Sequence, residues 1–308
     1  MSRGRIFLLG WILVLGLSSC SPGESPASLS EAAATVTHHR PPTETSSPRT
    51  PTETSSPSPT STATPSPTAS ICREQAGRVV DEHLEATAWP EGVHYRIYLP
   101  PCYEQTEKRY PALYLLHGQT YDQSQWDQWG RLGLEQAANE LIARDEIPPV
   151  LIVMPREVDA FSLPENSAFA EILLEDVIPH VDANYRTQPE RAYRAIGGIS
   201  RGGNWAIHVG LSNWELFTSI GAHSAPVFFS DKPEKIRAWL GQIPEGDYPR
   251  IYLDSSQGDP YLERNLRFET ILVEEGIPHE WHLSPGFHNE DYWAAHVETY
   301  LRWYTAIW

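Results

Sequence analysis

The chain has 308 residues, of which 40% are hydrophobic and 20% are charged, and its formal net charge is −17. Residues 1–70 hold four basic and four acidic side chains, so the whole negative excess falls on residues 71–308. Because nucleic-acid-binding proteins present basic patches to phosphates, this charge argues against nucleic acid as a partner.

Residues 1–20 have the pattern of a secretory signal, with Arg3 and Arg5 before an apolar run that ends at Leu17. The run over residues 6–17 is too short to cross a bilayer, which takes about 20 apolar residues. Residues 17–20, Leu-Ser-Ser-Cys, resemble the lipobox of bacterial lipoproteins, whose cysteine receives a diacylglyceryl group. The resemblance implies an exported protein, lipid-anchored through Cys20 to the outer face of the bacterial cell membrane. An ordinary cleavable signal with an incidental cysteine is the alternative.

Residues 21–70 contain no aromatic residue, and 25 of the 30 positions in residues 41–70 are Pro, Ser or Thr. A segment of this composition buries too little apolar surface to offset the entropy that folding removes. We therefore expect a disordered stalk over residues 21–70, followed by one folded domain over residues 71–308.

Cys72 and Cys102 are the cysteines that remain once Cys20 is assigned to the lipid. An exported domain meets oxidising conditions, so we expect these two to form a disulfide between the start of the domain and the end of an early strand. Two free buried thiols are the alternative. Neither cysteine has a second ligand at the spacing of a zinc site, so the sequence indicates no metal.

Short apolar runs that end in turn residues recur along the domain, and the later runs are separated by segments with helical spacing. The expected strands are residues 95–99, 112–116, 150–154, 192–199, 218–222, 251–253 and 280–283. The expected helices are residues 168–181, 203–211, 262–275 and 291–303, with a short helix near residues 234–240. This alternation predicts an α/β fold, a three-layer sandwich with a mostly parallel central sheet and helices on both faces.

The early tyrosine-rich strands have no long helix between them, so antiparallel pairing is expected at that edge of the sheet. About 25 residues separate the strand that ends near His223 from the strand that starts at Arg250. This is room for one short helix and not for a large cap domain. We therefore expect an open site at the top of the sheet.

Residues 198–202, Gly-Ile-Ser-Arg-Gly, fit the G-x-S-x-G pattern of a nucleophile elbow. A serine on a sharp turn between strand and helix projects its hydroxyl above the sheet, and the flanking glycines leave room for the crowded backbone. An expected strand precedes Ser200 and an expected helix follows it, which is the context that the motif requires. A glycine-rich turn with a bystander serine is the alternative.

A serine hydroxyl becomes a nucleophile when a base takes its proton, and in α/β hydrolases the chain order is serine, acid, histidine. His288 is the candidate base because it lies in a loop directly after the last expected strand, where parallel sheets carry their chemistry. The other histidines after Ser200 are His208, His223, His279, His282 and His296.

Two aspartates follow the preceding strand and compete for the role of the acid. Asp254 lies closer to the strand, whereas Asp259 lies in the loop before the next helix. The loop position leaves Asp259 freer to reach an imidazole nitrogen and fix its tautomer, so Asp259 is favoured. Asp254 would then brace the turn.

The oxyanion of an acyl-transfer reaction needs two backbone N–H donors. The helix that begins after Ser200 supplies the amide of Arg201, and the loop after the strand 112–116 supplies the amide of Gln119. His117 stands before Gly118 in that loop, where a structural hydrogen bond suits it better than a role as the base.

The sequence resembles the "putative esterase" family of α/β hydrolases, which includes esterase D, enterochelin, feruloyl and acetyl-xylan esterases and mycolyltransferases. The matching stretches are residues 98–103, 109–118, the elbow at Ser200, Gly258-Asp259 and Gly286-Phe287-His288. They follow the order of the family and cover nearly all of residues 78–308. The resemblance also implies that Trp126 and Trp129 line the substrate cleft, although either could instead pack against the sheet.

The leading hypothesis is a surface-anchored serine esterase that needs no metal or organic cofactor. Its substrates would be small-molecule, siderophore or polysaccharide-linked esters. An acyltransferase with the same triad is one alternative. The other is a non-catalytic envelope protein on a hydrolase scaffold, which a degenerate triad would have favoured.

Overall fold

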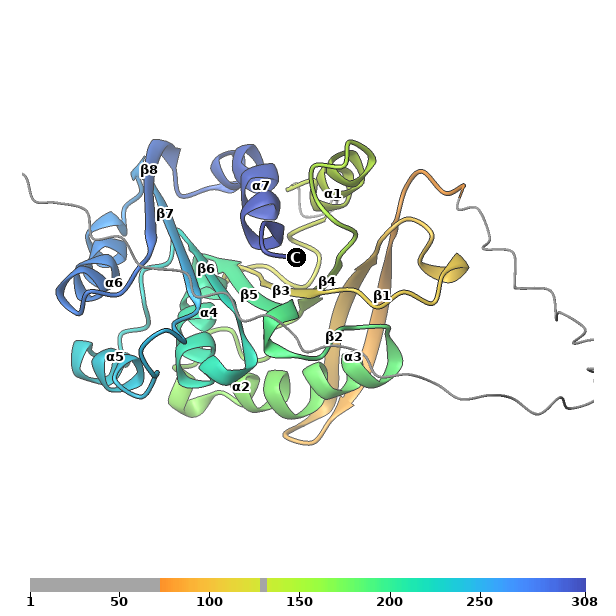
Figure 1. The fold of residues 1–308 in the computed structure, drawn as a ribbon. Coiled ribbons are helices and arrows are strands. Elements are labelled where there is room, and N and C mark those ends of the chain that lie inside the picture. Colours follow the sequence, from red (N-terminus) through yellow and green to blue (C-terminus); the bar gives the residue numbers. More distant parts are fainter. Residues whose placement is uncertain (1–72, 128–131) are drawn as a thin grey trace, which may run out of the picture. The chain divides into compact units, whose positions relative to one another are not determined.

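A computed structural model gives the structure of residues 73–127 and 132–308, which lie in one compact unit (Figure 1). The strands are β1 Arg78–Ala86, β2 Trp89–Leu99, β3 Ala112–Leu116, β4 Leu151–Pro155, β5 Arg194–Ile199, β6 Ser219–His223, β7 Arg250–Gly258 and β8 Glu280–Phe287. The helices are α1 Leu134–Ala143, α2 Phe169–Glu171, α3 Ile178–Asn184, α4 Arg201–Ser212, α5 Pro233–Leu240, α6 Leu262–Glu274 and α7 Glu290–Thr305, with a π-helical segment Ile172–Val177 between α2 and α3.

The eight strands form one sheet in the order β1-β2-β4-β3-β5-β6-β7-β8. Strands β1, β2 and β4 pair antiparallel, as expected for the early edge, and every other neighbouring pair is parallel. The carboxyl ends of β3 to β8 therefore lie along the same edge of the sheet, which is where a doubly wound sheet places its ligands.

Helices cover both faces of the sheet, and each face has its own apolar core. One core joins α1 and α7 to side chains from β3, β4 and β5. The other joins α4, α5, α6 and the helical segment over residues 169–184 to the opposite face. The predicted three-layer α/β architecture is confirmed, and the segment between β6 and β7 holds the short helix α5 in place of a large cap.

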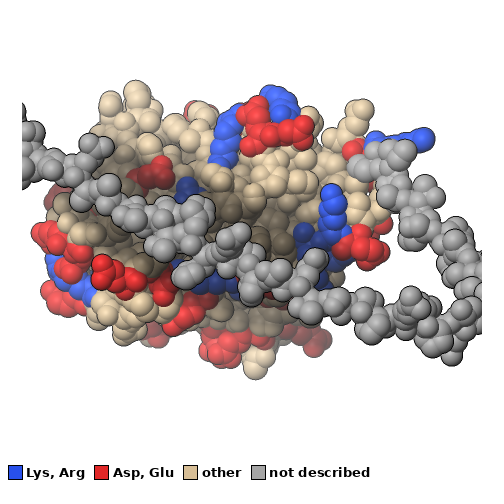
Figure 2. Space-filling model, in the orientation of Figure 1, with Lys and Arg blue, Asp and Glu red and all other residues tan. Residues whose placement is uncertain are grey.

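The acidic character of the sequence is visible on the surface. Figure 2 shows carboxylates along the lower side of the view, over the helices of that face, with fewer basic side chains among them.

The signal peptide, the stalk, Cys20 and Cys72 lie outside the described residues, so the expectations for them stay predictions. Cys102 is buried, with a φ angle of 63° at the end of the segment that follows β2. In the part of the chain that is described, no helix has the length and apolar character needed to cross a membrane.

Candidate active site

Ser200 stands alone between a strand and a helix. β5 ends at Ile199, α4 begins at Arg201, and Ser200 adopts φ 52° and ψ −117°, which non-glycine residues rarely occupy. A backbone hydrogen bond of 2.8 Å from the Ser200 N–H to the His223 carbonyl holds the turn. Strain of this kind persists where the surroundings fix it, and it is concentrated at functional sites.

The glycines of the elbow are required by space. A Cβ added to Gly198 would lie 2.4 Å from the Gly202 carbonyl carbon, and one added to Gly202 would lie 2.2 Å from the Leu116 carbonyl oxygen. Both distances are far below van der Waals contact, so any side chain would push the helix away from the strand ends. Glycine at these two positions brings β3, the elbow and α4 together.

The three predicted triad residues lie within hydrogen-bond distance of one another. The Ser200 Oγ lies 2.9 Å from the His288 Nε2, and the His288 Nδ1 lies 2.9 Å from the Asp259 Oδ2. β7 ends at Gly258 and β8 ends at Phe287, so Asp259 and His288 follow adjacent strands directly. The rings of Tyr261 and Trp293 stand edge-on to the imidazole, with centroids 5.2 and 5.0 Å away.

Asp259 is held by several donors besides His288. Its Oδ1 accepts from the Tyr261 N–H at 2.7 Å, and its Oδ2 accepts from the Ser255 hydroxyl at 3.1 Å and the Asn265 amide at 3.3 Å. Burial alone would raise the pKa of Asp259, but the hydrogen bonds from His288 and Tyr261 outweigh it and lower the pKa below its usual range. The ionised carboxylate keeps the proton of His288 on Nδ1, which leaves Nε2 free to accept the serine proton.

The amides of Gln119 and Arg201 flank the same serine. Both residues line the cleft together with Ser200 and His288, and among the described residues no acceptor is found for either N–H. The Arg201 amide is the first of α4, at the positive end of the helix dipole. The two N–H groups are thus available to an oxygen bound at Ser200.

His117 shapes the loop that carries Gln119. Its Nε2 accepts from the Glu157 N–H and its Nδ1 donates to the Gly118 carbonyl, both at 2.8 Å. Burial lowers the pKa of His117 to about 4, so the ring stays neutral near neutral pH. These contacts are structural, and His117 does not contact the serine hydroxyl.

The cleft above Ser200 has a volume of about 460 Å³ and is lined by polar, charged and aromatic side chains. The aromatic side chains that line it are Tyr121, Phe228, Phe229, Tyr261 and Trp293. Phe229 is 73% exposed, which is far more than a core residue would be. Exposed aromatic side chains around a concave site are typical of ligand binding.

The expectation that Trp126 lines this cleft is corrected by the structure. Trp126 is 1% exposed, packs in the core between the sheet and the α1–α7 face, and donates from its indole nitrogen to the Leu116 carbonyl at 3.1 Å. A wide apolar ring with one donor fits this position, where the strand end supplies an acceptor. Trp129 lies outside the described residues.

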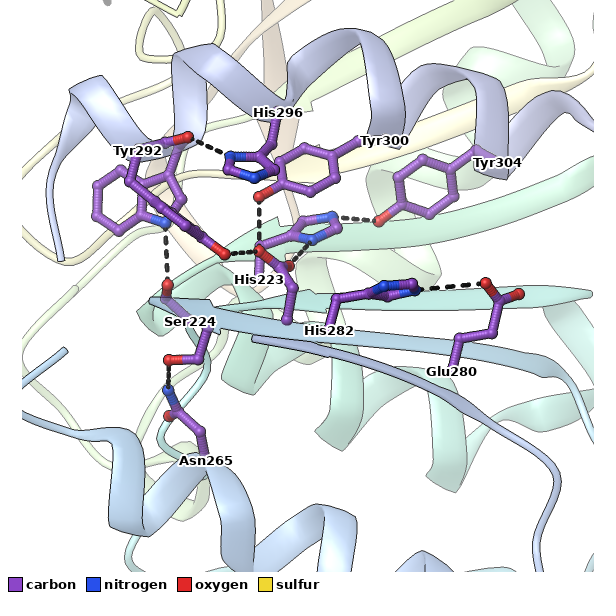
Figure 3. Close-up of polar contacts among 12 residues, drawn as sticks. His223, Ser224, Asn265, Glu280, His282, Tyr292, His296, Tyr300 and Tyr304 are labelled. Carbon is purple, nitrogen blue, oxygen red and sulfur yellow. Dashed lines mark hydrogen bonds and ion pairs between the residues drawn. The ribbon is translucent and has the colours of Figure 1, made fainter. Parts of the chain in front are cut away.

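The rejected acid, Asp254, belongs to a second aspartate–histidine pair inside the core. Figure 3 shows its partner His223 next to Tyr300 and Tyr304. Its Oδ1 lies 2.6 Å from the His223 Nδ1, and its Oδ2 accepts from the hydroxyls of Tyr292 and Tyr300, each at 2.8 Å. The Tyr304 hydroxyl lies 3.0 Å from the His223 Nε2. Burial raises the pKa of Tyr300 and of Tyr304 well above the ordinary value, so both phenols stay protonated.

The other histidines have partners away from Ser200. The His208 ring contacts the Asp231 carboxylate at 2.8 Å, and the rings of His279 and His296 contact the carbonyls of Ile277 and Tyr292. His282 lies 3.6 Å from the carboxylate of Glu280, its neighbour on β8. Within residues 73–127 and 132–308, His288 is the only histidine at hydrogen-bond distance from the Ser200 hydroxyl. Within the same residues, no group of acidic, histidine or cysteine side chains is arranged to hold a metal ion.

Residues 86–304 match the family described as "Putative esterase". Esterase Rv1288 of Mycobacterium tuberculosis is 31% identical over 258 residues, which cover 66% of this chain and 53% of that protein. An endo-1,4-beta-xylanase/feruloyl esterase of Xylanibacter ruminicola is 29% identical over 170 residues, which cover 50% of this chain and 22% of that protein. The chain thus spans about half of the first relative and about a fifth of the second.

Solved structures of esterases and serine hydrolases share the fold. A ferulic acid esterase superposes with a TM-score of 0.67 at 24% identity, covering 76% of this chain and 100% of that one. The serine hydrolase FphF of Staphylococcus aureus gives a TM-score of 0.64 at 19% identity, covering 75% and 99%. The family match spans the elbow and both of its partners, so the chain belongs to this esterase family of serine hydrolases with an α/β-hydrolase fold.

Proposed function

We propose that the protein hydrolyses carboxylic esters, with Ser200 as nucleophile, His288 as general base and acid, and Asp259 as the group that orients the histidine. The observation that carries this proposal is the 2.9 Å contact between the Ser200 Oγ and the His288 Nε2 on the floor of an open cleft. A nucleophile and a base at hydrogen-bond distance, with the base oriented by a third group, is the arrangement that acyl transfer needs.

The reaction has two halves. His288 takes the hydroxyl proton as the Ser200 Oγ attacks the ester carbonyl, and the oxygen of the tetrahedral intermediate gains its negative charge between the Gln119 and Arg201 amides. The protonated imidazole then gives its proton to the leaving alcohol as the C–O bond breaks. Water enters by the reverse route, and the acid product leaves with the serine hydroxyl restored.

The aromatic lining of the cleft and the feruloyl esterases among the relatives support esters of aromatic acids linked to polysaccharides as substrates. Flat acyl groups pack well against Tyr and Phe rings, whose edges and faces contribute beyond simple area burial. In the part of the chain that the structure describes, no large cap covers the cleft, which suits a substrate group attached to a polymer.

The activity is tested by Ser200→Ala with 4-nitrophenyl acetate and methyl ferulate as substrates. We expect turnover of both to vanish while the circular dichroism spectrum and melting temperature match those of the unchanged protein. Continued hydrolysis by a folded Ser200→Ala protein would refute the assignment of the nucleophile. If the unchanged protein hydrolyses 4-nitrophenyl acetate but not methyl ferulate, the esterase activity stands and the proposed class of aromatic substrates is refuted.

We also propose that the domain is exported, anchored through a lipidated Cys20 and closed by a Cys72–Cys102 disulfide. The lipobox resemblance and the two remaining cysteines support this. Metabolic labelling with an alkyne fatty acid should mark the full-length protein in a bacterial host and fail to mark Cys20→Ser. The intact mass should be about 2 Da higher after reduction than before it, because reducing one disulfide adds two hydrogen atoms. A label retained on Cys20→Ser would refute the anchor, and an unchanged mass would refute the disulfide.

A further inference from the structure

Three strand ends beside the elbow are tied together by side chains that take no part in the triad. β4, β3 and β5 are neighbours in the sheet, and Glu157, His117 and Arg201 follow their carboxyl ends. All three residues are buried, with Glu157 at 5% and Arg201 at 8% exposure. Burying an ionic group costs free energy because the group leaves water, so the burial of Glu157 and Arg201 calls for a compensating interaction or a function.

Glu157 controls one oxyanion donor through its main chain. The Glu157 N–H donates to the His117 Nε2, which leaves the ring proton on Nδ1 to donate to the Gly118 carbonyl. That carbonyl also accepts from the Tyr121 N–H at 3.1 Å. Because the Gly118 C=O and the Gln119 N–H belong to one planar peptide, fixing the carbonyl also fixes the direction of the N–H.

Glu157 controls the other donor through its side chain. The Arg201 Nε lies 2.8 and 2.9 Å from the two carboxylate oxygens, and its Nη2 lies 2.6 Å from the Oε1. The Trp205 indole nitrogen donates to the same oxygen at 2.6 Å, and the Arg201 Nη2 also donates to the Ser162 carbonyl at 2.6 Å. This bidentate pair fixes the first residue of α4, and its amide is the second oxyanion donor.

We propose that Glu157 is a positioning residue that holds both oxyanion N–H groups in register, one through His117 and one through Arg201. The inference rests on the proposed function, because it concerns the same reaction at Ser200. Oxyanion donors act only where they are aimed at the developing charge, so a small rotation of either peptide weakens catalysis without touching substrate binding. Glu157 itself contacts no substrate atom in this scheme.

An ion pair with a purely structural role could also be buried. The test therefore needs, as a control, a similar ion pair that lies away from the oxyanion loops. Arg194 and Asp182 provide it, with a contact of 2.6 Å and side-chain exposures of 4% and 21%. Arg194 begins β5, at the end of the strand opposite to Ser200. Asp182 lies on α3 and contacts this end of the strand, so Asp182→Asn removes the charge of a partly buried carboxylate without touching the oxyanion loops.

The readout is the rate ratio for a matched oxo-ester and thiono-ester. Sulfur accepts hydrogen bonds poorly, so a well-aimed pair of donors favours the oxo-ester strongly. In Glu157→Gln we expect kcat for the oxo-ester to fall about 10- to 100-fold, less than the roughly 100- to 1,000-fold that loss of one donor costs. KM and the thiono-ester rate should change less than about 3-fold, so the ratio of the oxo-ester rate to the thiono-ester rate should fall.

Arg201→Met keeps the backbone N–H and removes the guanidinium, so it should lower the ratio as Glu157→Gln does. The double variant should be no worse than either single variant, because both break one coupling. It also leaves no unpaired buried charge, and so provides the test if a single variant fails to fold. Asp182→Asn should lower the melting temperature and leave the ratio within about 2-fold.

An equal loss on both esters in Glu157→Gln, or an unchanged ratio in the folded double variant, would overturn the positioning role. A wild-type protein that hydrolyses neither ester would overturn the proposed function itself, and the positioning role with it. These results are distinguishable because the first two require an active wild-type enzyme.

Discussion

Two of the aspartate–histidine pairs in the described residues have a hydroxyl on the far side of the ring, and only one of these two pairs faces a cleft. Asp259 and His288 meet at 2.9 Å, with a serine hydroxyl 2.9 Å beyond the ring. Asp254 and His223 meet at 2.6 Å, with the Tyr304 hydroxyl 3.0 Å beyond the ring. The His288 side chain is 14% exposed and the His223 side chain is fully buried.

The comparison shows that the pair alone does not make a catalyst. Tyr304 rests on the sheet, where a Cβ on Gly197 or Gly221 would come within 1.7 or 1.8 Å of its hydroxyl oxygen. No substrate reaches that oxygen, and burial keeps the pKa of Tyr304 well above its ordinary value. The elbow, the cleft and the amides of Gln119 and Arg201 distinguish the Asp259–His288 pair from this buried pair.

The two histidines should separate activity from stability. We expect His288→Gln to lower kcat by about 10⁴-fold with little change in melting temperature, because the base is lost at a partly exposed position after the last strand. His223→Gln should keep kcat within a few-fold and melt earlier. Initial rates with 4-nitrophenyl acetate and a thermal melt of each variant check this, and a reversed pattern would mean that the wrong pair is catalytic.

The two aspartates extend the test. Asp259→Asn should lower kcat by about 10³- to 10⁴-fold, because an amide no longer holds the imidazole in the required tautomer. Asp254→Asn should instead lower the free energy of unfolding by about 3 kcal/mol, since three donors lose their ionised acceptor. Urea unfolding and steady-state kinetics measure the two effects. Similar kinetics for both variants would contradict the distinction.

His117 is a buried histidine whose hydrogen bonds, among the described residues, are to the backbone groups of Gly118 and Glu157. Its pKa of about 4 lies below the ordinary value of 6.5, so the unfolded chain binds the proton first. The contribution of the neutral ring is complete above pH 6.5 and is lost as the pH falls toward 4, by about 3 kcal/mol in total. Unfolding curves between pH 7 and 4 should show this slope, and His117→Asn should remove it. An equal slope in the variant would assign the loss to other groups.

The smallest effect is expected for Tyr304→Phe. The variant leaves the His223 Nε2 without its donor, which costs about 1–2 kcal/mol of unfolding free energy. The esterase rate should not change, because Tyr304 is remote from the cleft lining. A melt and a rate assay on the same preparation decide it, and a lower rate at unchanged stability would link the buried pair to catalysis.

The sequence predicted the layered α/β fold because the strands of a doubly wound sheet are short apolar runs. It predicted the meeting of Ser200, Asp259 and His288 because the carboxyl ends of parallel strands share one edge. β1 was not anticipated, since its sequence RVVDEHLEA has no strict alternation of apolar and polar residues and carries several charged residues. α1 was missed as well, although Leu134, Ala138 and Leu141 have helical spacing and are buried.

Local sequence patterns indicated less about the buried Asp254–His223 pair and about the ion pair between Glu157 and Arg201. Residues 150–154 indicated a strand, but nothing near Glu157 says that its side chain reaches the arginine after the nucleophile. The three tyrosines of α7 that surround the Asp254–His223 pair, at positions 292, 300 and 304, have helical spacing, yet they read as core packing. Long-range polar contacts of this kind depend on which strands become neighbours, and the order of strands is not written in local patterns.

The histidine of the triad follows β8, which has a neighbour on one side only. A transient separation of that last strand would withdraw the base while most of the hydrophobic interior stayed intact. Loss of turnover on heating or in mild denaturant should therefore precede loss of the global fold. Enzyme activity thus becomes a sensitive reporter of fraying at this border.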